Sequence, residues 1–265
     1  MNKFETFIGV DLGGGKGKNT AVARLERAES GVQVTDYGTG KDAPWFDDRL
    51  LSYLLAQDER TLVAIDAPLT LPVCVRCQLP SCPTVERCDV PVVRWFQDRA
   101  SKPRVDGIVS NTTKPRYTSY TQRATEVVLH EEHHILPRET LGQGMGPLTA
   151  RTAYLLRALS ARYQLSKNLI EVYPKATLTQ LFGARTATRY KRSAGSPAAR
   201  LEILNGLSDV AFAPGAWREH GLSNDHKFDA ILCAYTAYLF AEGRCLPPPD
   251  SMVEQDGWIW IPRAA

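Results

Sequence analysis

Four acidic residues stand where carboxylates from distant parts of the chain can meet. Asp11 ends a short β-rich run, Asp66 ends a continuous apolar run, Glu171 lies within a later run, and Asp229 opens the last long apolar segment. Carboxylates brought together repel one another unless a cation lies between them. Mg²⁺ or Mn²⁺ bound through oxygen would relieve this repulsion, and two such ions can clamp the attacking and leaving oxygens of a phosphodiester.

Each acidic residue also has a purely structural interpretation. Asp11 beside three glycines can shape a turn, Asp66 before Ala-Pro can cap one, and Asp229 can be a charge near a helix N-terminus. Asp225 and His226 precede Asp229 by four and three residues, so all three can share one helical face. Because several acidic residues recur at element ends, we favour the metal-site hypothesis over the separate structural ones.

The elements that must position these residues follow from hydrophobic periodicity. We predict strands within 4–12, 20–26, 31–38, 61–69 and 168–174, with an edge strand at 257–262. We predict helices within 45–57, 147–164, 176–183, 197–207 and 225–242, and a helical segment at 121–134. A three-stranded meander followed by alternating helices and strands gives a mixed sheet flanked by helices, and so an α/β fold.

The stretch 70–147 interrupts this regular pattern. It is rich in cysteine, proline, glycine and basic residues, so we predict one domain over 1–265 with an insertion or lid at 70–147. In such a sheet, the ends of the first and fourth strands can lie side by side, which would bring Asp11 and Asp66 together. Glu171 is the weaker candidate, because its strand can direct it away from the site.

Four cysteines fall within the insertion, with spacing C-x2-C-x4-C-x5-C. They are Cys74, Cys77, Cys82 and Cys88. Four thiolates this close in sequence can surround Zn²⁺ tetrahedrally. The spacing matches neither familiar ferredoxin pattern, so zinc is favoured over an iron–sulfur cluster. Four cysteines that bind no metal are the alternative.

A glycine-rich turn follows the first strand. Glycines can let backbone N–H groups approach phosphate, and Lys16 or Lys18 can add positive charge to bind a substrate. The turn resembles the first phosphate loop of the sugar kinase, actin and Hsp70 superfamily, although it does not satisfy the P-loop pattern. A tight hairpin with solvated lysines is the favoured interpretation.

Residues His130 to His134 contain H-E-x-x-H, the helix signature of zinc metalloproteases. Pro137 ends the helical pattern within one turn. The longer form of the motif, H-E-x-x-H-x-x-G-x-x-H, would require glycine and histidine where the chain has Pro137 and Thr140. The solvated end of an amphipathic helix is therefore favoured over a protease site.

Basic and aromatic residues interleave in the insertion, and a second basic group follows residue 184. Such mixtures can hold phosphates and stack bases, with solvated surface charge as the alternative. Arg123 is a candidate substrate contact, although its spacing from Glu126 also fits a helix pair. The basic residues are Arg94, Arg99, Lys102, Arg104, Lys114, Arg116, Arg123, Arg185, Arg189, Lys191, Arg192 and Arg200.

Composition sets the remaining limits. The 265 residues are 43% hydrophobic and 23% charged, which is ordinary for a globular protein. The net charge of +3 does not by itself demonstrate a nucleic-acid partner. The longest apolar run, near 233–241, is too short to cross a bilayer, and the first residues lack the pattern of a secretory signal. We therefore expect a cytoplasmic protein without membrane contact.

Several segments together resemble the DUF429 family, which is regarded as predicted nucleases with an RNase H-like fold. They are GVDLG, IDAPL, YTQRATEVVL, GQGMGPLTARTA, EVYP and HKFDAILCAYTA, spread over nearly the whole chain. The resemblance implies an RNase H-like fold with Asp11, Asp66 and Asp229 as metal ligands. Glu171 or Asp225 would then complete the ligand set.

The sequence therefore predicts a metal-dependent nuclease, a hydrolase acting on DNA or RNA by two-metal hydrolysis. Two alternatives are an ATP-handling phosphotransferase that uses the glycine turn and a non-catalytic nucleic-acid-binding module. Tight binding of ATP would favour the first, and salt-sensitive nucleic-acid binding without cleavage would favour the second.

Overall fold

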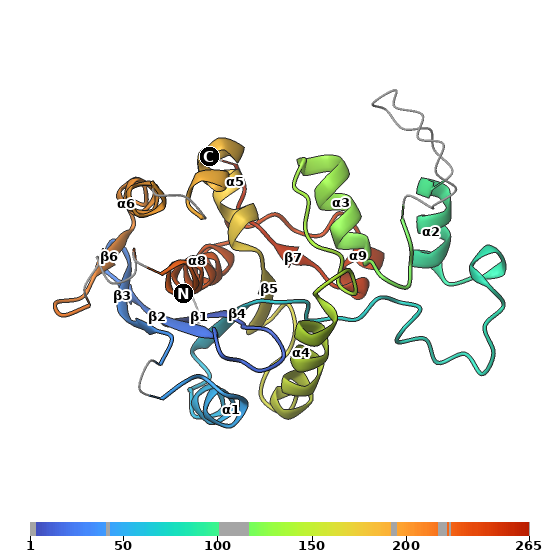
Figure 1. Cartoon of the computed structure of the whole chain (residues 1–265), viewed down its shortest axis with the longest axis horizontal. Coiled ribbons are helices and arrows are strands. Elements are labelled where there is room, and N and C mark those ends of the chain that lie inside the picture. The colour runs from blue at the N-terminus through green and yellow to red at the C-terminus, as the bar shows by residue number, and fades with distance from the viewer. Residues whose placement is uncertain are drawn as a thin grey trace. The chain divides into compact units, whose positions relative to one another are not determined.

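The protein is described by a computed structural model that covers residues 4–40, 43–100, 117–191, 195–216, 222 and 224–264. Seven strands form one mixed sheet in the order β6-β3-β2-β1-β4-β5-β7 (Figure 1). The strands are β1 Thr6–Asp11, β2 Ala21–Ala28, β3 Gly31–Gly38, β4 Thr61–Asp66, β5 Leu169–Val172, β6 Val210–Phe212 and β7 Ile259–Trp260.

Strand direction within the sheet confirms the predicted α/β class. Strands β1, β2 and β3 form an antiparallel meander, whereas β4 pairs parallel to β1 and β5 pairs parallel to β4. Every residue of β1 is buried, as is typical of a strand covered on both faces. The sheet with its flanking helices is consistent with an RNase H-like arrangement.

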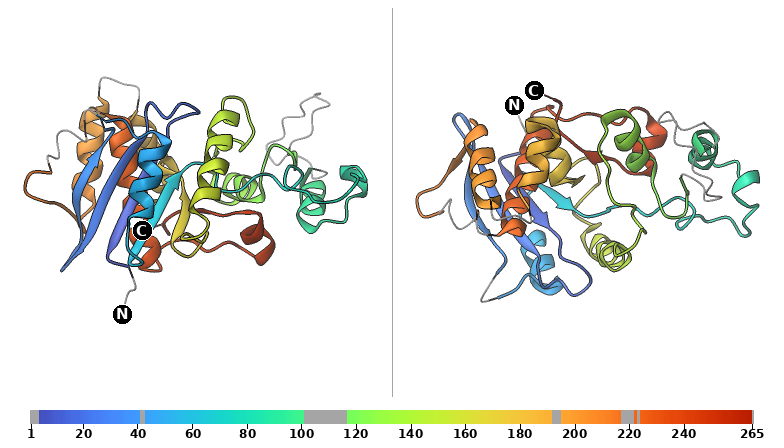
Figure 2. Two further views of the ribbon diagram at one scale, coloured as in Figure 1. Left: turned by 90° about the horizontal axis from the view of Figure 1, so that it is seen from below. Right: turned by 45° about the horizontal axis from the view of Figure 1, so that its top comes forward.

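Helices cover both faces of this sheet, as Figure 1 shows and the two views of Figure 2 repeat from other directions. One face packs against α5, α6 and α8, and the other against α1 and α4, which gives two separate hydrophobic clusters. The helices are α1 Asp47–Leu55, η1 Val85–Arg87, α2 Pro91–Ala100, α3 Ala124–His133, α4 Gly146–Leu159, α5 Pro174–Arg189, α6 Ser196–Gly206, α8 Asp225–Ala241 and α9 Ser251–Asp256.

Helix α8 lies directly against β1 because Gly9 leaves room for it. A Cβ atom at Gly9 would lie 2.0 Å from the carbonyl oxygen of Ala230 and 2.3 Å from the amide nitrogen of Ala234. Both contacts are with helix backbone, which cannot rotate away as a long side chain can. Residue 9 and Asp11 point to the same face of the strand, so this close approach also brings the start of α8 near Asp11.

The chain divides into two compact units. Unit 1 comprises Met1–Leu69, Pro147–Pro247 and Ile259–Ala265, and it contains the whole sheet. Unit 2 comprises Thr70–Gly146 and Pro248–Trp258. Unit 2 thus includes almost all of the stretch that the sequence assigns to an insertion, and it also recruits a short segment near the C-terminus.

The segment 248–258 is anchored in unit 2 by the buried carboxylate of Asp256. Its two oxygens accept hydrogen bonds from Arg76 Nη2 at 2.6 Å and from the backbone N–H of Ala124 at 2.7 Å. Sequence periodicity did not indicate α9, α2 or β6, which are short or lie in the irregular stretch. Within the described ranges, no helix has the length and apolar character needed to cross a membrane.

Candidate metal centre

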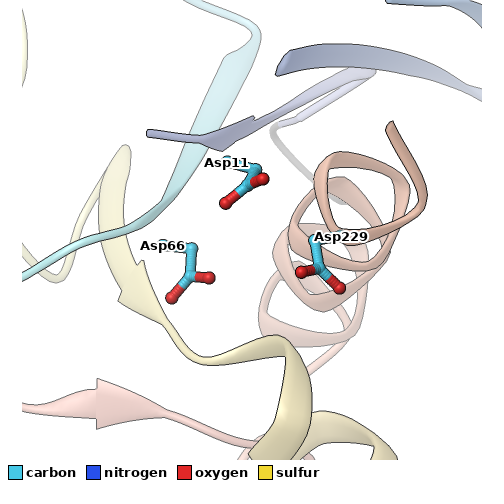
Figure 3. Close-up of side chains that lie close together, drawn as sticks. All are labelled: Asp11, Asp66 and Asp229. Atoms are coloured by element: carbon cyan, nitrogen blue, oxygen red, sulfur yellow. The ribbon is translucent and has the colours of Figure 1, made fainter. Parts of the chain in front are cut away.

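Three carboxylates from separate elements of unit 1 converge beside the sheet (Figure 3). Asp11, Asp66 and Asp229 each offer one oxygen, and these three atoms all lie within 4.8 Å of one another. Asp229 is fully buried, Asp11 is nearly so, and Asp66 is partly buried. These are the three aspartates that the sequence nominated as metal ligands.

Sheet register explains why Asp11 and Asp66 are neighbours. Each is the last residue of its strand, and the two are direct partners in the parallel pairing of β1 with β4. The carboxyl ends of adjacent parallel strands share one edge, so the two side chains leave the sheet at the same level.

Helix α8, which packs on one face of the sheet, contributes the third carboxylate. Asn224 caps this helix by accepting a hydrogen bond from the backbone N–H of Lys227 at 3.1 Å. Asp229 follows in the second turn, where the helix is buried almost throughout. Its Oδ1 atom is buried and accepts no well-formed hydrogen bond from the described residues, which is costly for a carboxylate oxygen away from water.

Two basic side chains face the acidic cluster. The Lys191 ammonium forms an ion pair with Asp229 Oδ2, and His226 Nδ1 lies 2.7 Å from Asp11 Oδ2. Three carboxylates therefore face one lysine and one histidine, which leaves the site negatively charged when the acids are ionised.

This crowding alters the acid–base behaviour of the site. Burial raises the pKa of Asp66 well above its usual value, and the charges of Asp11 and Asp229 raise it further. Burial also raises the pKa of Asp229 to about 7, although the charge of Lys191 acts in the opposite direction. The hydrogen bond that the protonated His226 ring donates to the Asp11 carboxylate raises the pKa of His226, although burial acts in the opposite direction. The cluster therefore retains protons near neutral pH unless another cation replaces them.

The fourth acidic candidate, Glu171, lies on β5 and is buried. Its Oε2 accepts a hydrogen bond from the backbone N–H of Leu69 at 2.7 Å, which ties down the turn that follows β4. Glu171 is not part of the three-carboxylate group, but its charge contributes to the raised pKa of Asp66. It thus lies next to the cluster while holding the segment that carries Asp66.

The glycine turn after β1 is closed by a buried arginine of α4. Arg151 Nη1 donates to the carbonyl oxygen of Gly13 at 2.6 Å and to Thr20 Oγ1 at 2.8 Å, which joins the two ends of the turn. Lys16 and Lys18 are exposed on its outside. This arrangement agrees with the tight hairpin that the sequence analysis favoured over a phosphate loop.

Arg123 lies in unit 2 and is almost fully buried. Its guanidinium contacts Glu126 Oε1 at 3.0 Å and Thr70 Oγ1 at 3.0 Å, so the structure places it in an internal polar network. Arg200 is likewise buried, and Arg94 pairs with Asp89, whereas Arg185 and Arg189 are exposed. The predicted basic residues Lys102, Arg104, Lys114, Arg116 and Arg192 lie outside the described residues.

The H-E-x-x-H segment does not present two histidines on one helical face. Helix α3 ends at His133, and His134 adopts the left-handed conformation with φ of 55°. Glu131 would be the base of a protease site. Its Oε2 atom lies 3.3 Å from Arg99 Nε, and its Oε1 atom accepts a hydrogen bond from the Tyr117 hydroxyl. The geometry therefore supports a helix end rather than a protease site. His130 instead lines a cavity of about 530 Å³ within unit 2, which none of the three aspartates lines.

Sequence analysis missed some neighbours of the cluster. The sequence places Lys191 in a basic group that can hold phosphates, and it indicates no contact of Lys191, Tyr190 or Cys233 with the acidic residues. Cys233 follows Asp229 by one helical turn. Burial raises the pKa of the Cys233 thiol well above its usual range, and the charge of Asp66 raises it further. Burial and the charge of Asp229 similarly raise the pKa of Tyr190. The i, i+4 spacing of Asp229 and Cys233 was the available signal for the cysteine.

Comparison with curated proteins and with solved structures returned no match. A family model described as "Protein of unknown function (DUF429)" matches residues 9–253, which include all three aspartates. This match spans nearly the whole chain, and the chain therefore belongs to the DUF429 family.

Proposed function

We propose that this protein is a metal-dependent phosphodiesterase that cleaves DNA or RNA, with Mg²⁺ or Mn²⁺ held by Asp11, Asp66 and Asp229. The observation that carries the proposal is the convergence of these three carboxylates, whose oxygens lie within 4.8 Å of one another around the fully buried Asp229. Ionised carboxylates this close repel one another, and bound Mg²⁺ or Mn²⁺ would relieve that repulsion.

The donor atoms fit this class of cation. All three are carboxylate oxygens, which Mg²⁺ and Mn²⁺ prefer to softer ligands. Oxygens bound to Mg²⁺ at about 2.1 Å lie roughly 3–4 Å apart, so ligand atoms within 4.8 Å need to move only slightly to share one ion. A second ion would need further oxygens, for which Glu171 and Asp225 remain the candidates.

The protein's own residues divide the remaining tasks. His226 orients Asp11 through the Nδ1 contact, Lys191 balances part of the charge of Asp229, and Glu171 fixes the turn behind Asp66. A bound divalent cation would stabilise charge on the phosphoryl oxygens and lower the pKa of a water molecule that attacks phosphorus. The exposed Arg185 and Arg189 lie close in sequence to Lys191 and are candidates for backbone phosphate contacts.

The nuclease hypothesis has more support than the phosphotransferase hypothesis. Phosphate binding at the glycine turn would need backbone N–H groups that face a ligand, whereas Arg151 draws the ends of this turn together from within. The carboxylate cluster, by contrast, offers the oxygen donors that could hold a metal ion for in-line displacement at phosphorus.

A cleavage assay with matched aspartate variants tests the proposal. Labelled single-stranded DNA, double-stranded DNA, RNA and a branched DNA would each be incubated with the full-length protein and Mg²⁺ or Mn²⁺. We expect cleavage of at least one substrate, its loss on chelation, and a decrease of at least about a thousandfold in Asp11→Asn, Asp66→Asn and Asp229→Asn.

Asp48→Asn provides the control, because Asp48 is an exposed aspartate at the start of α1 in the same unit. It should cleave at the wild-type rate. Normal cleavage by Asp11→Asn, cleavage that survives chelation, or the absence of cleavage on every substrate would each reject the proposal.

A further inference from the structure

The cysteine segment of unit 2 has almost no hydrophobic support. Across residues 73–88 only Cys88 is buried, and two apolar side chains, Val75 and Leu79, are 48% and 50% exposed. The segment contains no strand, and its one regular element is the three-residue helix η1. Burial of apolar side chains, which orders most chain segments, therefore does little to hold this one.

The four thiols nevertheless lie on one short stretch of the chain. All four are free cysteines, and they lie between residues 74 and 88. A loop of this length can bring four sulfurs around a single ion. In the structure the four sulfurs have not closed around a common point, because no three of them fall within 4.8 Å of one another.

The sulfurs of Cys77 and Cys74 each form a hydrogen bond with a neighbouring group that could stabilise a thiolate ligand. The backbone N–H of Leu79 donates to Cys77 Sγ at 3.5 Å, across a turn of two residues. Cys74 Sγ lies 3.2 Å from Ser119 Oγ, and the Cys74 backbone N–H donates to the Ser119 carbonyl. Donors directed at a metal-bound sulfur orient it and stabilise its charge.

The last of the four cysteines connects the segment to the packed part of the unit. Cys88 is 9% exposed and precedes helix α2, whose residues Val92, Val93 and Phe96 are buried. An ion bound to Cys88 and to the three preceding cysteines would fasten the exposed loop to this helix.

We propose that Cys74, Cys77, Cys82 and Cys88 form a structural Zn²⁺ site that orders the segment 73–88 of unit 2. Four sulfur donors suit Zn²⁺, which takes four ligands in tetrahedral geometry without a preference imposed by d electrons. Each thiol releases its proton to solvent as it binds, and the loop draws inward until the four sulfurs surround the ion. The site is independent of the acidic cluster and of any phosphodiesterase activity.

Metal analysis of the purified full-length protein tests this proposal. We expect about one zinc per chain when the protein is prepared in a reducing buffer without chelator. Cys77→Ser and Cys82→Ser alter exposed residues, so they should fold while losing at least about fivefold in zinc content. Cys245→Ser, which changes a cysteine outside the cluster and in unit 1, should retain zinc.

A second measurement covers the case in which a variant folds poorly. Wild-type protein stripped of metal and reconstituted with Co²⁺ should show the absorption bands of tetrahedral thiolate coordination, and residues 73–88 should become more resistant to protease. Asp66→Asn should keep its zinc content and show unchanged cobalt–thiolate absorption bands, which separates this site from the acidic one. Zinc below about 0.2 per chain with no cobalt band, or iron with inorganic sulfide in place of zinc, would overturn the proposal.

Discussion

The acidic cluster of unit 1 and the cysteine segment of unit 2 are built by different means. In unit 1, two adjacent strands and a capped helix bring Asp11, Asp66 and Asp229 together. In unit 2, the four cysteines lie on an irregular loop with little buried apolar area, and their sulfurs have not closed around a point. The first site is preformed by the fold, whereas the second would be completed by its ion.

This difference implies opposite energetic roles for the two proposed ions. A preformed carboxylate cluster stores electrostatic repulsion, which the raised pKa values of Asp66 and Asp229 reflect, and an ion there relieves strain. A loop without a core instead loses conformational entropy on ordering, and an ion there supplies the missing order. Metal removal should therefore leave unit 1 folded and loosen the cysteine segment.

The largest expected effect comes from disturbing the preformed site at Gly9. We expect Gly9→Ala to lower the free energy of unfolding by about 3 kcal/mol, because the new Cβ would lie 2.0 Å from the Ala230 carbonyl oxygen. Forcing α8 away from β1 should also weaken Mn²⁺ binding, since Asp229 moves with the helix. Urea unfolding and calorimetric titration with Mn²⁺ would measure the two effects.

Gly14→Ala is the matched control, since a Cβ at this exposed position would meet no atom within 4 Å. Its stability should remain within about 0.5 kcal/mol of wild type. Zinc content should be unchanged in both variants. Wild-type stability and Mn²⁺ affinity in Gly9→Ala would show that the close packing of α8 on β1 does not build the site.

Most of the central fold was predictable because its elements have strong periodicity. The continuous apolar run before Asp66 indicated a strand buried on both faces, and the meander at 4–38 and the long C-terminal helix were both confirmed. Strand β6 and helix α9 were not predicted, because three or six residues are too few to establish a period. The recruitment of Pro248–Trp258 into unit 2 depends on long-range contacts of Asp256, which no local pattern encodes.

The candidate site was predictable in its ligands but not in its surroundings. Asp11 and Asp66 sit at strand ends, and strand ends follow from local sequence, so their meeting could be inferred from topology. The pairing of Lys191 with Asp229 could not, because it joins residues of separate segments that share no sequence pattern. The buried position of Arg123 also escaped prediction, since arginine is an exposed residue in most contexts.

An intermediate effect is expected from pH. A buried carboxyl group with a raised pKa binds more protons in the folded than in the unfolded state. The free energy of unfolding therefore falls as pH rises from the unfolded-state pKa to the folded-state pKa. For Asp229 this interval runs from about 4 in the unfolded chain to about 7 in the folded one. The raised pKa of His226 acts in the same direction, because the stability contributed by its protonated form is lost as pH rises through the folded value.

Without divalent metal, we therefore expect the protein to lose stability on the order of 2 kcal/mol between pH 5 and 8, and Mn²⁺ to reverse much of that loss. Urea unfolding at several pH values, with and without Mn²⁺, would measure this. Asp229→Asn should flatten the profile of the metal-free protein. A stability that is constant over this range, or a response to Mn²⁺ that is as large at pH 5 as at pH 8, would contradict the preformed repulsive cluster.

The smallest effect should come from replacing Lys191. The change in Mn²⁺ affinity distinguishes a lysine that repels the metal ion from one that is needed to hold Asp229 in position. The Lys191 ammonium faces Asp229 Oδ2, which leaves Oδ1 for an ion, so lysine and metal would share one carboxylate at the cost of mutual repulsion. We expect Lys191→Met to strengthen Mn²⁺ binding at pH 8 by about threefold to tenfold, or roughly 1 kcal/mol. Lys175→Met, at an exposed position on α5, should leave the affinity unchanged. Weaker Mn²⁺ binding in Lys191→Met would mean that the lysine is needed to orient Asp229, and that the carboxylates of unit 1 are less completely preformed than their convergence implies.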